Sequence, residues 1–304
     1  QIERLRPTVR QIADQLLDAA QAKQEETGSF DLIADYAEPL PVAVIAELLG
    51  VPQDRGDDLR TWSQRIVRMY DYRRSPQDEQ LARVAAEEFA EFMAQVAADR
   101  LRNPGDDLLT HLAQVEAEGE RLSERELVAA GVLLLNAGHE ASVNGFGNGM
   151  VAMFAQPDQL ARLVHEQDRP GGDMAALTET AIEEMVRFDT PAQLFERTAK
   201  EDTEILGVPL RAGDRIAALL GAANRDPAVF DQPDAFLVDR SPNPHIAFGA
   251  GIHFCLGAPL ARMEFSVTLP LLLERFPRLR PAGDPVLRDT FVLHGYTTVP
   301  VTAA

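Results

Sequence analysis

Apolar residues recur at intervals of three and four along much of the chain, the spacing that places side chains on one face of a helix. Residues 1–25 show this pattern with apolar positions from Leu5 to Leu16. Residues 39–50 begin with proline and end with glycine, and residues 76–102 stop at "NPGDD", as helices with defined ends do. These patterns predict a mainly helical chain.

A longer helix is predicted from Ser123 to about Phe154. Ser123 and Glu126 have the spacing of a capping box, in which each side chain bonds the backbone of the other residue. The segment that follows, "AAGVLLLNAGHEASVNGFGNGMVAMF", is apolar around most of its circumference. We therefore expect this helix to be buried.

Strand patterns occur only in the second half of the chain. Residues 203–220 predict two strands about a glycine turn, and residues 290–301 predict a terminal strand or hairpin. Neither a repeat nor a low-complexity linker divides the chain. The expected fold class is mainly α with small β-sheets (α+β), in a single domain over residues 1–304.

Composition narrows the possible functions. The chain has 304 residues, 45% of them hydrophobic, and a formal charge of −19, which disfavours nucleic acid and anionic membranes as partners. The first twenty residues do not resemble a signal peptide, and apolar runs such as residues 132–135 are too short to cross a bilayer. One cysteine cannot form an internal disulfide. We expect a soluble protein of the reducing cytoplasm.

The single cysteine, Cys255, lies in a loop framed by glycines. A free cysteine is most often a small buried apolar side chain. Here, however, a helical pattern with Pro259 in its first turn begins just after the sulfur, so the helix amino terminus would favour the thiolate. The glycines leave room for a large flat partner. These features point to axial ligation of haem iron.

The segment "FGAGIHFCLGAPLAR" resembles the haem-binding loop of the cytochrome P450 family. The resemblance implies haem b as cofactor and Cys255 as its iron ligand, framed by Gly249 and Gly257. It also places Phe248 beside the cysteine and implies that His253 hydrogen-bonds a haem propionate. The alternative for His253 is a solvated imidazole of the loop.

Two further segments match the same family. Glu184 and Arg187 in "EEMVR" are three residues apart, so they share one helical face and can pair. Such a pair is most often a surface salt bridge, but the resemblance implies that Arg240 joins it in a buried structural triad. In "ERTAKED", the resemblance implies that Arg197 contacts a propionate, and the alternative is an exposed arginine.

The segment "AGHEAS" resembles the family's oxygen-activation motif. The resemblance gives Glu140 the acid position, but Ala141 stands where the family usually has threonine. Ser142 follows, and one residue along a helix turns a side chain by about 100°. We expect protons to pass through ordered water or a substrate hydroxyl rather than directly from Ser142. The alternative readings are a salt bridge for Glu140 and a packing notch for Gly138.

The resemblance also implies a distal wall above the haem. Asn136, Ala141 and Leu194 are expected to line the substrate pocket, with Ala137 against the cofactor. Their mostly apolar character suits a macrocycle, terpenoid or polyketide. The opening "IERLRPTVRQIADQLL" resembles a helix just past the start of the family's catalytic half, so the expected P450 fold is amino-terminally truncated.

The resulting hypothesis is a bacterial-type monooxygenase that inserts one oxygen atom of O₂ into a hydrophobic organic substrate. Because the chain has one cysteine and no flavin or iron–sulfur module, electrons are expected from a ferredoxin and its reductase. The main alternative is a P450-like auxiliary or binding protein with little turnover. A hydrolase with a cysteine nucleophile and a zinc site are weaker alternatives, because neither a positioned base nor a chelating set is evident.

Overall fold

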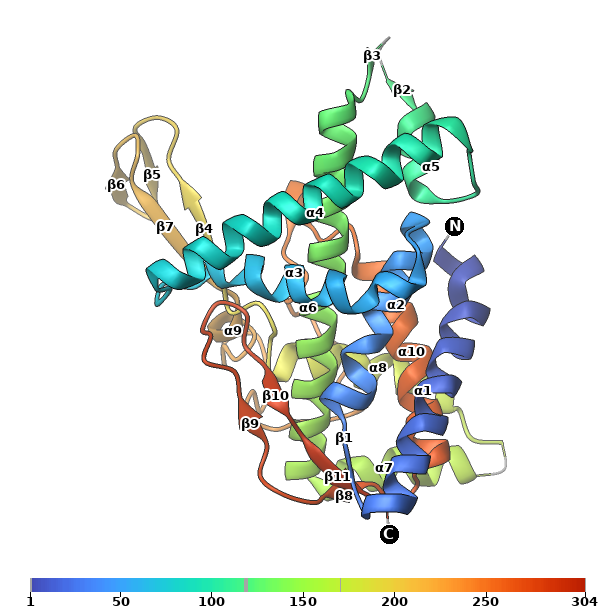
Figure 1. Ribbon diagram of the computed structural model, residues 1–304. Coiled ribbons are helices and arrows are strands. Elements are labelled where there is room, and N and C mark those ends of the chain that lie inside the picture. The colour runs from blue at the N-terminus through green and yellow to red at the C-terminus, as the bar shows by residue number, and fades with distance from the viewer. Residues whose placement is uncertain (1, 118–119, 170, 304) are drawn as a thin grey trace.

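The computed structural model describes residues 2–117, 120–169 and 171–303, and most of them are helical (Figure 1). The α-helices are α1 Arg6–Thr27, α2 Pro39–Leu49, α3 Gly56–Val67, α4 Pro76–Arg102, α5 Leu108–Gln114, α6 Glu124–Ala155, α7 Pro157–Asp168, α8 Met174–Phe188, α9 Leu220–Ala223 and α10 Ala258–Arg275. A π-helical turn, η2, spans Ile33–Ala37, and short 3₁₀ turns span Ile2–Leu5, Gln53–Arg55, Arg68–Tyr70 and Gly251–His253. The mainly helical prediction is confirmed.

The strands are short and form small antiparallel sheets. They are β1 Phe30–Asp31, β2 Glu116–Ala117, β3 Glu120–Arg121, β4 Leu194–Thr198, β5 Thr203–Ile205, β6 Val208–Leu210, β7 Arg215–Leu219, β8 Arg280–Pro281, β9 Val286–Leu287, β10 Tyr296–Thr298 and β11 Pro300–Thr302. In the largest described sheet, β11 lies between β1 and β8, so it pairs a segment near the carboxyl end with residues 30–31.

Helix α6 runs through the middle of the molecule (Figure 1). Its predicted capping box is present: Ser123 Oγ accepts from the Glu126 backbone N–H, and the Glu126 carboxylate accepts from the Ser123 N–H. The helix packs against α2, α3, α4, α8 and α10, which explains why its sequence is apolar on nearly all sides.

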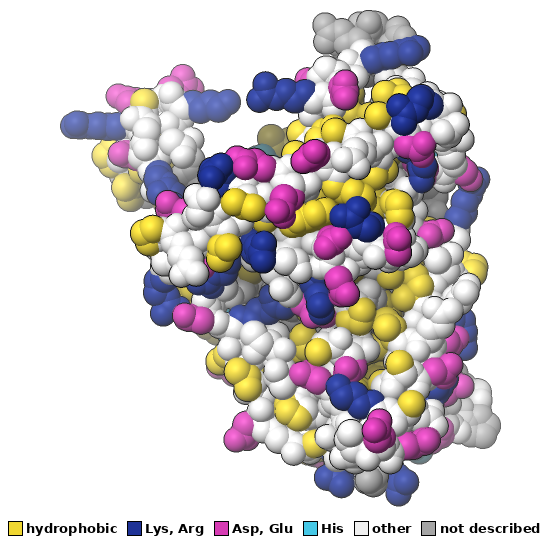
Figure 2. Space-filling view, in the orientation of Figure 1, with side chains coloured by type: hydrophobic (Ala, Val, Ile, Leu, Met, Phe, Trp, Pro, Cys, Tyr) yellow, Lys and Arg dark blue, Asp and Glu magenta, His cyan; other side chains and the backbone are white. Residues whose placement is uncertain are grey.

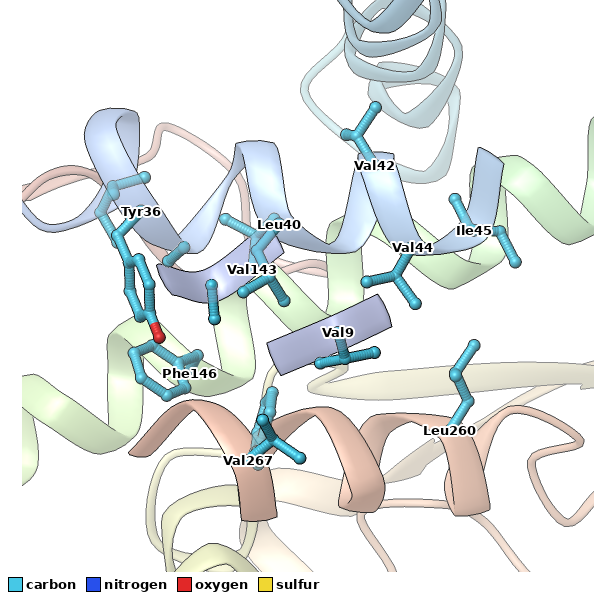
Figure 3. Packing of buried hydrophobic residues seen from close by; sticks show 14 of the residues in the cluster. Val9, Tyr36, Leu40, Val42, Val44, Ile45, Val143, Phe146, Leu260 and Val267 are labelled. Carbon is cyan, nitrogen blue, oxygen red and sulfur yellow. The ribbon is translucent and has the colours of Figure 1, made fainter. Parts of the chain in front are cut away.

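The core lies where α1 and α2 pack over α6 and α10 (Figure 3). Val9 of α1 is fully buried between apolar side chains of α2 and α10. The buried face of α1 consists of Val9, Ala13, Leu17 and Ala20. Leu5, at the start of the expected face, is only half buried, so the face is rotated slightly from the predicted one.

The strand predictions were partly wrong. Residues 203–220 hold a β5–β6 hairpin, turned at Leu206 and Gly207 with positive φ. The third strand of this segment, β7, pairs instead with β4. Near the carboxyl end, β10 pairs with β9 and β11 pairs with β1 and β8, so they do not form a hairpin with each other.

Charge is mixed over the surface. On the face seen in Figure 2, acidic and basic side chains lie among one another with apolar patches between them. This face therefore carries no broad area of a single sign, in spite of the formal charge of −19. Among the described residues, every helix is too short or too polar to span a membrane.

Candidate active site

The cysteine loop, residues 245–257, exposes its thiol. Gly249 and Gly251 adopt φ values of +72° and +63°, which only glycine adopts without strain. The turn they make lets the Cys255 N–H donate to the Phe248 carbonyl oxygen over 2.8 Å. Cys255 is exposed, and α10 begins three residues later with Pro259 in its first turn. The sulfur therefore lies at a helix amino terminus, as the sequence predicted.

Apolar side chains surround the exposed thiol. Ile252 is 98% exposed, Leu256 82% and Phe254 50%. Phe248 is half buried behind the loop, with the Arg262 guanidinium 4.5 Å from its ring centroid. An apolar, thiol-bearing surface of this kind is suited to a large apolar partner rather than to water.

A charged cluster supports the loop from behind. Glu183 of α8 accepts from the Arg262 guanidinium over 2.6 Å, and His245 Nε2 lies 2.8 Å from the same carboxylate. Burial opposes the charge on Glu183, but the hydrogen bonds from Arg262 and His245 outweigh it and lower the pKa of Glu183 to about 2. This cluster was not predicted from the sequence, although Glu183 is the first glutamate of "EEMVR".

Glu184, Arg187 and Arg240 come together in one buried network. Arg187 is fully buried and donates to both carboxylate oxygens of Glu184, over 2.7 and 2.8 Å. Its remaining N–H groups reach backbone carbonyl oxygens, including that of Asn224. Arg240 Nε lies 3.0 Å from Glu184 and its other nitrogens also reach carbonyls. All three side chains are thus satisfied, which a buried charge requires.

Asn224 connects this network to the cysteine loop. Its side-chain oxygen accepts from the Ile246 N–H over 2.8 Å, and its side-chain nitrogen donates to Thr190. Asn224 is fully buried. The network therefore fixes the start of the loop that carries Cys255.

On α6, one stripe of small and apolar side chains is left uncovered. Ala129, Leu133 and Ala137 are exposed and Ala141 is half buried, each four residues from the next. Leu133 is 61% exposed. The four residues lie on one helical face, which is the face that no other described element covers fully.

Glu140 and Ser142 point to other sides of α6. Glu140 is buried, and its Oε2 accepts from the Arg288 guanidinium over 2.8 Å. Burial raises the pKa of Glu140, while Arg288 lowers it by a smaller amount. The Ser142 hydroxyl donates back to the Gly138 carbonyl oxygen over 3.3 Å. A Cβ on Gly138 would lie 3.1 Å from Ile45, so Gly138 faces the packed helix α2.

The chain matches the family model "Cytochrome P450" over residues 1–298. The chain belongs to the cytochrome P450 family. It is 40% identical over 305 residues to cytochrome P450 107B1 of Saccharopolyspora erythraea, with 99% of this chain and 70% of the relative covered. It is also 40% identical over 304 residues to 6-deoxyerythronolide B hydroxylase of the same organism, covering 99% and 71%.

A solved structure shares the fold closely. P450BioI in complex with hexadec-9Z-enoic acid ligated acyl carrier protein matches with a TM-score of 0.91 and 35% identity, over 100% of this chain and 75% of that one. The chain is thus a P450 monooxygenase, an oxidoreductase that uses O₂ and an organic substrate. Membership of this family implies a haem iron that is bound by a cysteine thiolate.

The residues present fit such a group. Cys255 offers an exposed sulfur in an apolar surround, and Gly249 and Gly257 present no side chain there. Glu183 is the main cause that raises the pKa of the Arg262 guanidinium, and the charge of Cys255 raises it as well. The cysteine loop therefore has a cation close to its sulfur.

The other predicted site residues have varied surroundings. His253 and Arg197 are exposed, and Arg197 donates to the adjacent Glu196 carbonyl oxygen. Leu194 is buried on β4, where it is paired with Leu219 of β7. Asn136 is buried and accepts from the Ser63 hydroxyl over 2.6 Å, so its amide oxygen is engaged with α3.

Glu264 of α10 is an acid that the sequence analysis missed. It is 1% exposed, its Oε2 has no hydrogen-bond partner, and burial raises its pKa to about 8. It lines a hollow with Ser142, Phe146 and Thr268 that has room for about one water molecule. The sequence does signal this residue, because Glu264 is an acid that stands directly before the mostly apolar run "FSVTLPLLL".

Proposed function

We propose that this P450 hydroxylates a hydrophobic substrate of the macrocycle, polyketide or terpenoid class, with haem b as cofactor. The single observation that carries the proposal is the uncovered stripe Ala129, Leu133, Ala137 and Ala141 on an otherwise buried helix. Its side chains are apolar and mostly small, which suits a bulky apolar molecule better than a polar one. The similarity to 6-deoxyerythronolide B hydroxylase supports the same class.

Haem bound through Cys255 would supply O₂ binding and activation, and the thiolate donates electron density that assists O–O cleavage. We assign the fixing of the loop to the Glu183 cluster and to Glu184, Arg187 and Arg240. His253 and Arg197 are exposed, and we assign to each a hydrogen bond to a haem propionate. Electrons would come from a ferredoxin and its reductase.

Proton supply is the unusual part of the site. Ala141 has no hydroxyl, and the Ser142 hydroxyl is bonded to the Gly138 carbonyl. Ser142 shares its hollow with Glu264, an acid whose pKa of about 8 keeps it protonated at neutral pH. We propose that Glu264 holds a proton for this side of α6 and that a water or a substrate hydroxyl carries it past Ala141.

Isotope labelling tests the proposal. The haem-loaded protein, a ferredoxin, its reductase and NADPH are incubated under ¹⁸O₂ with macrolide aglycones, terpenoids and fatty acids. We expect one ¹⁸O atom in a product from the macrolide or terpenoid group. Incorporation only into fatty acids would contradict the substrate class, and NADPH consumption that yields only peroxide with every compound would contradict hydroxylation itself.

The role of the substrate hydroxyl has its own control. For the best substrate, an analogue without the hydroxyl nearest the oxidised carbon should bind equally well but release most of the reducing equivalents as peroxide. Equal coupling with both compounds would show that the proton path does not pass through the substrate.

A further inference from the structure

Four charged side chains form a row beside α6, on the side away from Ser142. The Arg288 guanidinium donates to Glu140 Oε2 over 2.8 Å, and another of its nitrogens lies 3.8 Å from Glu38 Oε1. Arg60 donates to Glu38 Oε2 over 3.2 Å. The order is therefore carboxylate, guanidinium, carboxylate, guanidinium.

This row runs from the core to solvent. In the order of the row, the side chain of Glu140 is 2% exposed, that of Arg288 14%, that of Glu38 9% and that of Arg60 37%. Arg60 also contacts Asp57, whose side chain is 95% exposed. The inner end of the row is thus buried and its outer end is exposed.

Separate elements hold the two buried carboxylates in place. Glu140 lies on α6, Glu38 precedes α2, and Arg288 follows β9. Arg288 is fixed by its own Nε, which donates to the Tyr296 carbonyl oxygen. Glu38 is held from α3 by the Gln64 amide, which donates to Glu38 Oε1. The spacing of the row is therefore set by the fold.

Arg288 is shared between two buried acids. A guanidinium keeps its proton at neutral pH, so the row holds two positive charges for two carboxylates, and Arg288 is the cation that lies between the two acids. His139, the other titratable group against Glu140, is fully buried, and burial, with Arg288 and Arg60, lowers its pKa to about 3. His139 is thus neutral and does not compensate either carboxylate.

We propose that Glu38 is a positioning residue for the proton chemistry of Glu140: its carboxylate competes for Arg288 and so allows Glu140 to take up and release a proton. If Arg288 paired with Glu140 alone, the Glu140 carboxylate would stay ionised in an ordinary ion pair. With Glu38 in place, Glu140 can take up a proton while Arg288 keeps a negative partner. The proposal rests on the proposed monooxygenase function and on the acid position that the resemblance of "AGHEAS" gives Glu140, whereas Glu264 holds a proton on the other side of α6.

The electrostatics of the row agree with this assignment. Burial is the largest cause that raises the pKa of Glu140, Arg288 opposes it, and the charge of Glu38 raises it further. In addition, Glu140 Oε1 has no hydrogen-bond partner among the described residues. One oxygen is thus held by Arg288 while the other is available to carry a proton.

Infrared titration of the purified full chain tests the proposal without turnover. A protonated buried carboxyl group gives a C=O stretching band, and a Glu264→Gln background removes the band of Glu264, the buried acid whose pKa is raised to about 8. The band that disappears in Glu140→Gln belongs to Glu140. Replacing Glu38 by glutamine should lower the midpoint of this band by about one pH unit.

Two further variants test the direction of the midpoint shift and whether the shift is specific to Glu38. Arg60→Gln removes the cation that neutralises Glu38, so it should raise the midpoint. Asp57→Asn removes an exposed carboxylate from the same arginine and should leave the midpoint unchanged. An unchanged midpoint in Glu38→Gln, or in Arg60→Gln if the first variant fails to fold, would overturn the proposal, as would the absence of the Glu140 band at every pH.

Turnover gives a second, separable readout. In Glu38→Gln the pH profile of kcat should shift in the same direction as the infrared midpoint, with KM unchanged. If the protein lacks hydroxylase activity, the infrared titration still tests the link between Glu38 and Glu140. If turnover is normal but neither the midpoint nor the profile moves, the role of Glu38 is refuted and the proposed function stands.

Discussion

A buried acid with an unpaired carboxyl oxygen costs stability, and Glu264, whose Oε2 has no partner among the described residues, is such a residue. Its pKa is raised from the ordinary value of 4.5 to about 8, so between these values the folded chain binds a proton that the unfolded chain has lost. Stability therefore falls as the pH rises from about 4.5 to about 8, by roughly 3–5 kcal/mol in total.

Glu264→Gln should remove this penalty. We expect the variant to be more stable than the wild type at pH 8 and nearly equal to it at pH 4.5, as measured by urea unfolding at both pH values. The same variant should increase the peroxide released per O₂ consumed, because a proton donor is lost. A gain in stability with unchanged coupling would show that Glu264 is not part of the proton supply.

A substitution at Ala141 tests the same proton supply by adding a hydroxyl instead of removing an acid. Ala141→Thr places a hydroxyl where the family usually has one, so coupling should depend less on the substrate hydroxyl. With the analogue that lacks this hydroxyl, we expect product per NADPH to rise by about tenfold or more. The control is Ala141→Val, which adds similar bulk without a hydroxyl; an equal gain in both variants would mean that filling space, not proton transfer, is responsible.

At the scale of elements, the buried network of Glu184, Arg187 and Arg240 joins α8 to the segment before the cysteine loop. Arg240→Lys keeps the charge but loses hydrogen bonds to backbone carbonyl oxygens, including that of Ala235. We expect a loss of about 2–4 kcal/mol in unfolding free energy and a lower haem content.

Arg162→Lys is the matched control for that change. Arg162 pairs with Asp239 at the surface, where its side chain is 44% exposed, so the substitution should cost less than about 1 kcal/mol. Both variants can be compared by urea unfolding at one pH. Equal losses would contradict the view that burial and carbonyl contacts make Arg240 structurally important.

Elements defined by local signals were predictable from the sequence, and those defined by distant partners were not. Helix α6 was predicted because its capping box lies within four residues and its apolar run is continuous. The partner of β7 is β4, which lies in another segment, so residues 203–220 gave only the β5–β6 hairpin correctly.

The site residues, too, were predictable only where a local motif surrounds them. Cys255 and Glu140 stand in short motifs, so their surroundings could be expected from the sequence. Arg288, however, reaches Glu140 across 148 positions, and the Glu38 that shares it has no motif around it. Contacts of this kind depend on how α2, α6 and the β9–β10 hairpin pack, which local patterns do not encode.

At the scale of the whole molecule, the packing of the helices around α6 and α10 leaves two parts of the site exposed. They are the apolar stripe of α6 and the loop that carries Cys255. The central claim is that the sulfur of Cys255 binds haem iron. The same fold without that bond would keep its core, because Cys255 is exposed and contributes little to packing.

The absorption spectrum of the reduced, CO-treated protein tests this claim most directly. The account predicts the red-shifted Soret band of thiolate-bound haem in the wild type and its loss in Cys255→Ser, with the circular dichroism of the helices unchanged. A wild-type spectrum without that band, or a band that persists in Cys255→Ser, would contradict it.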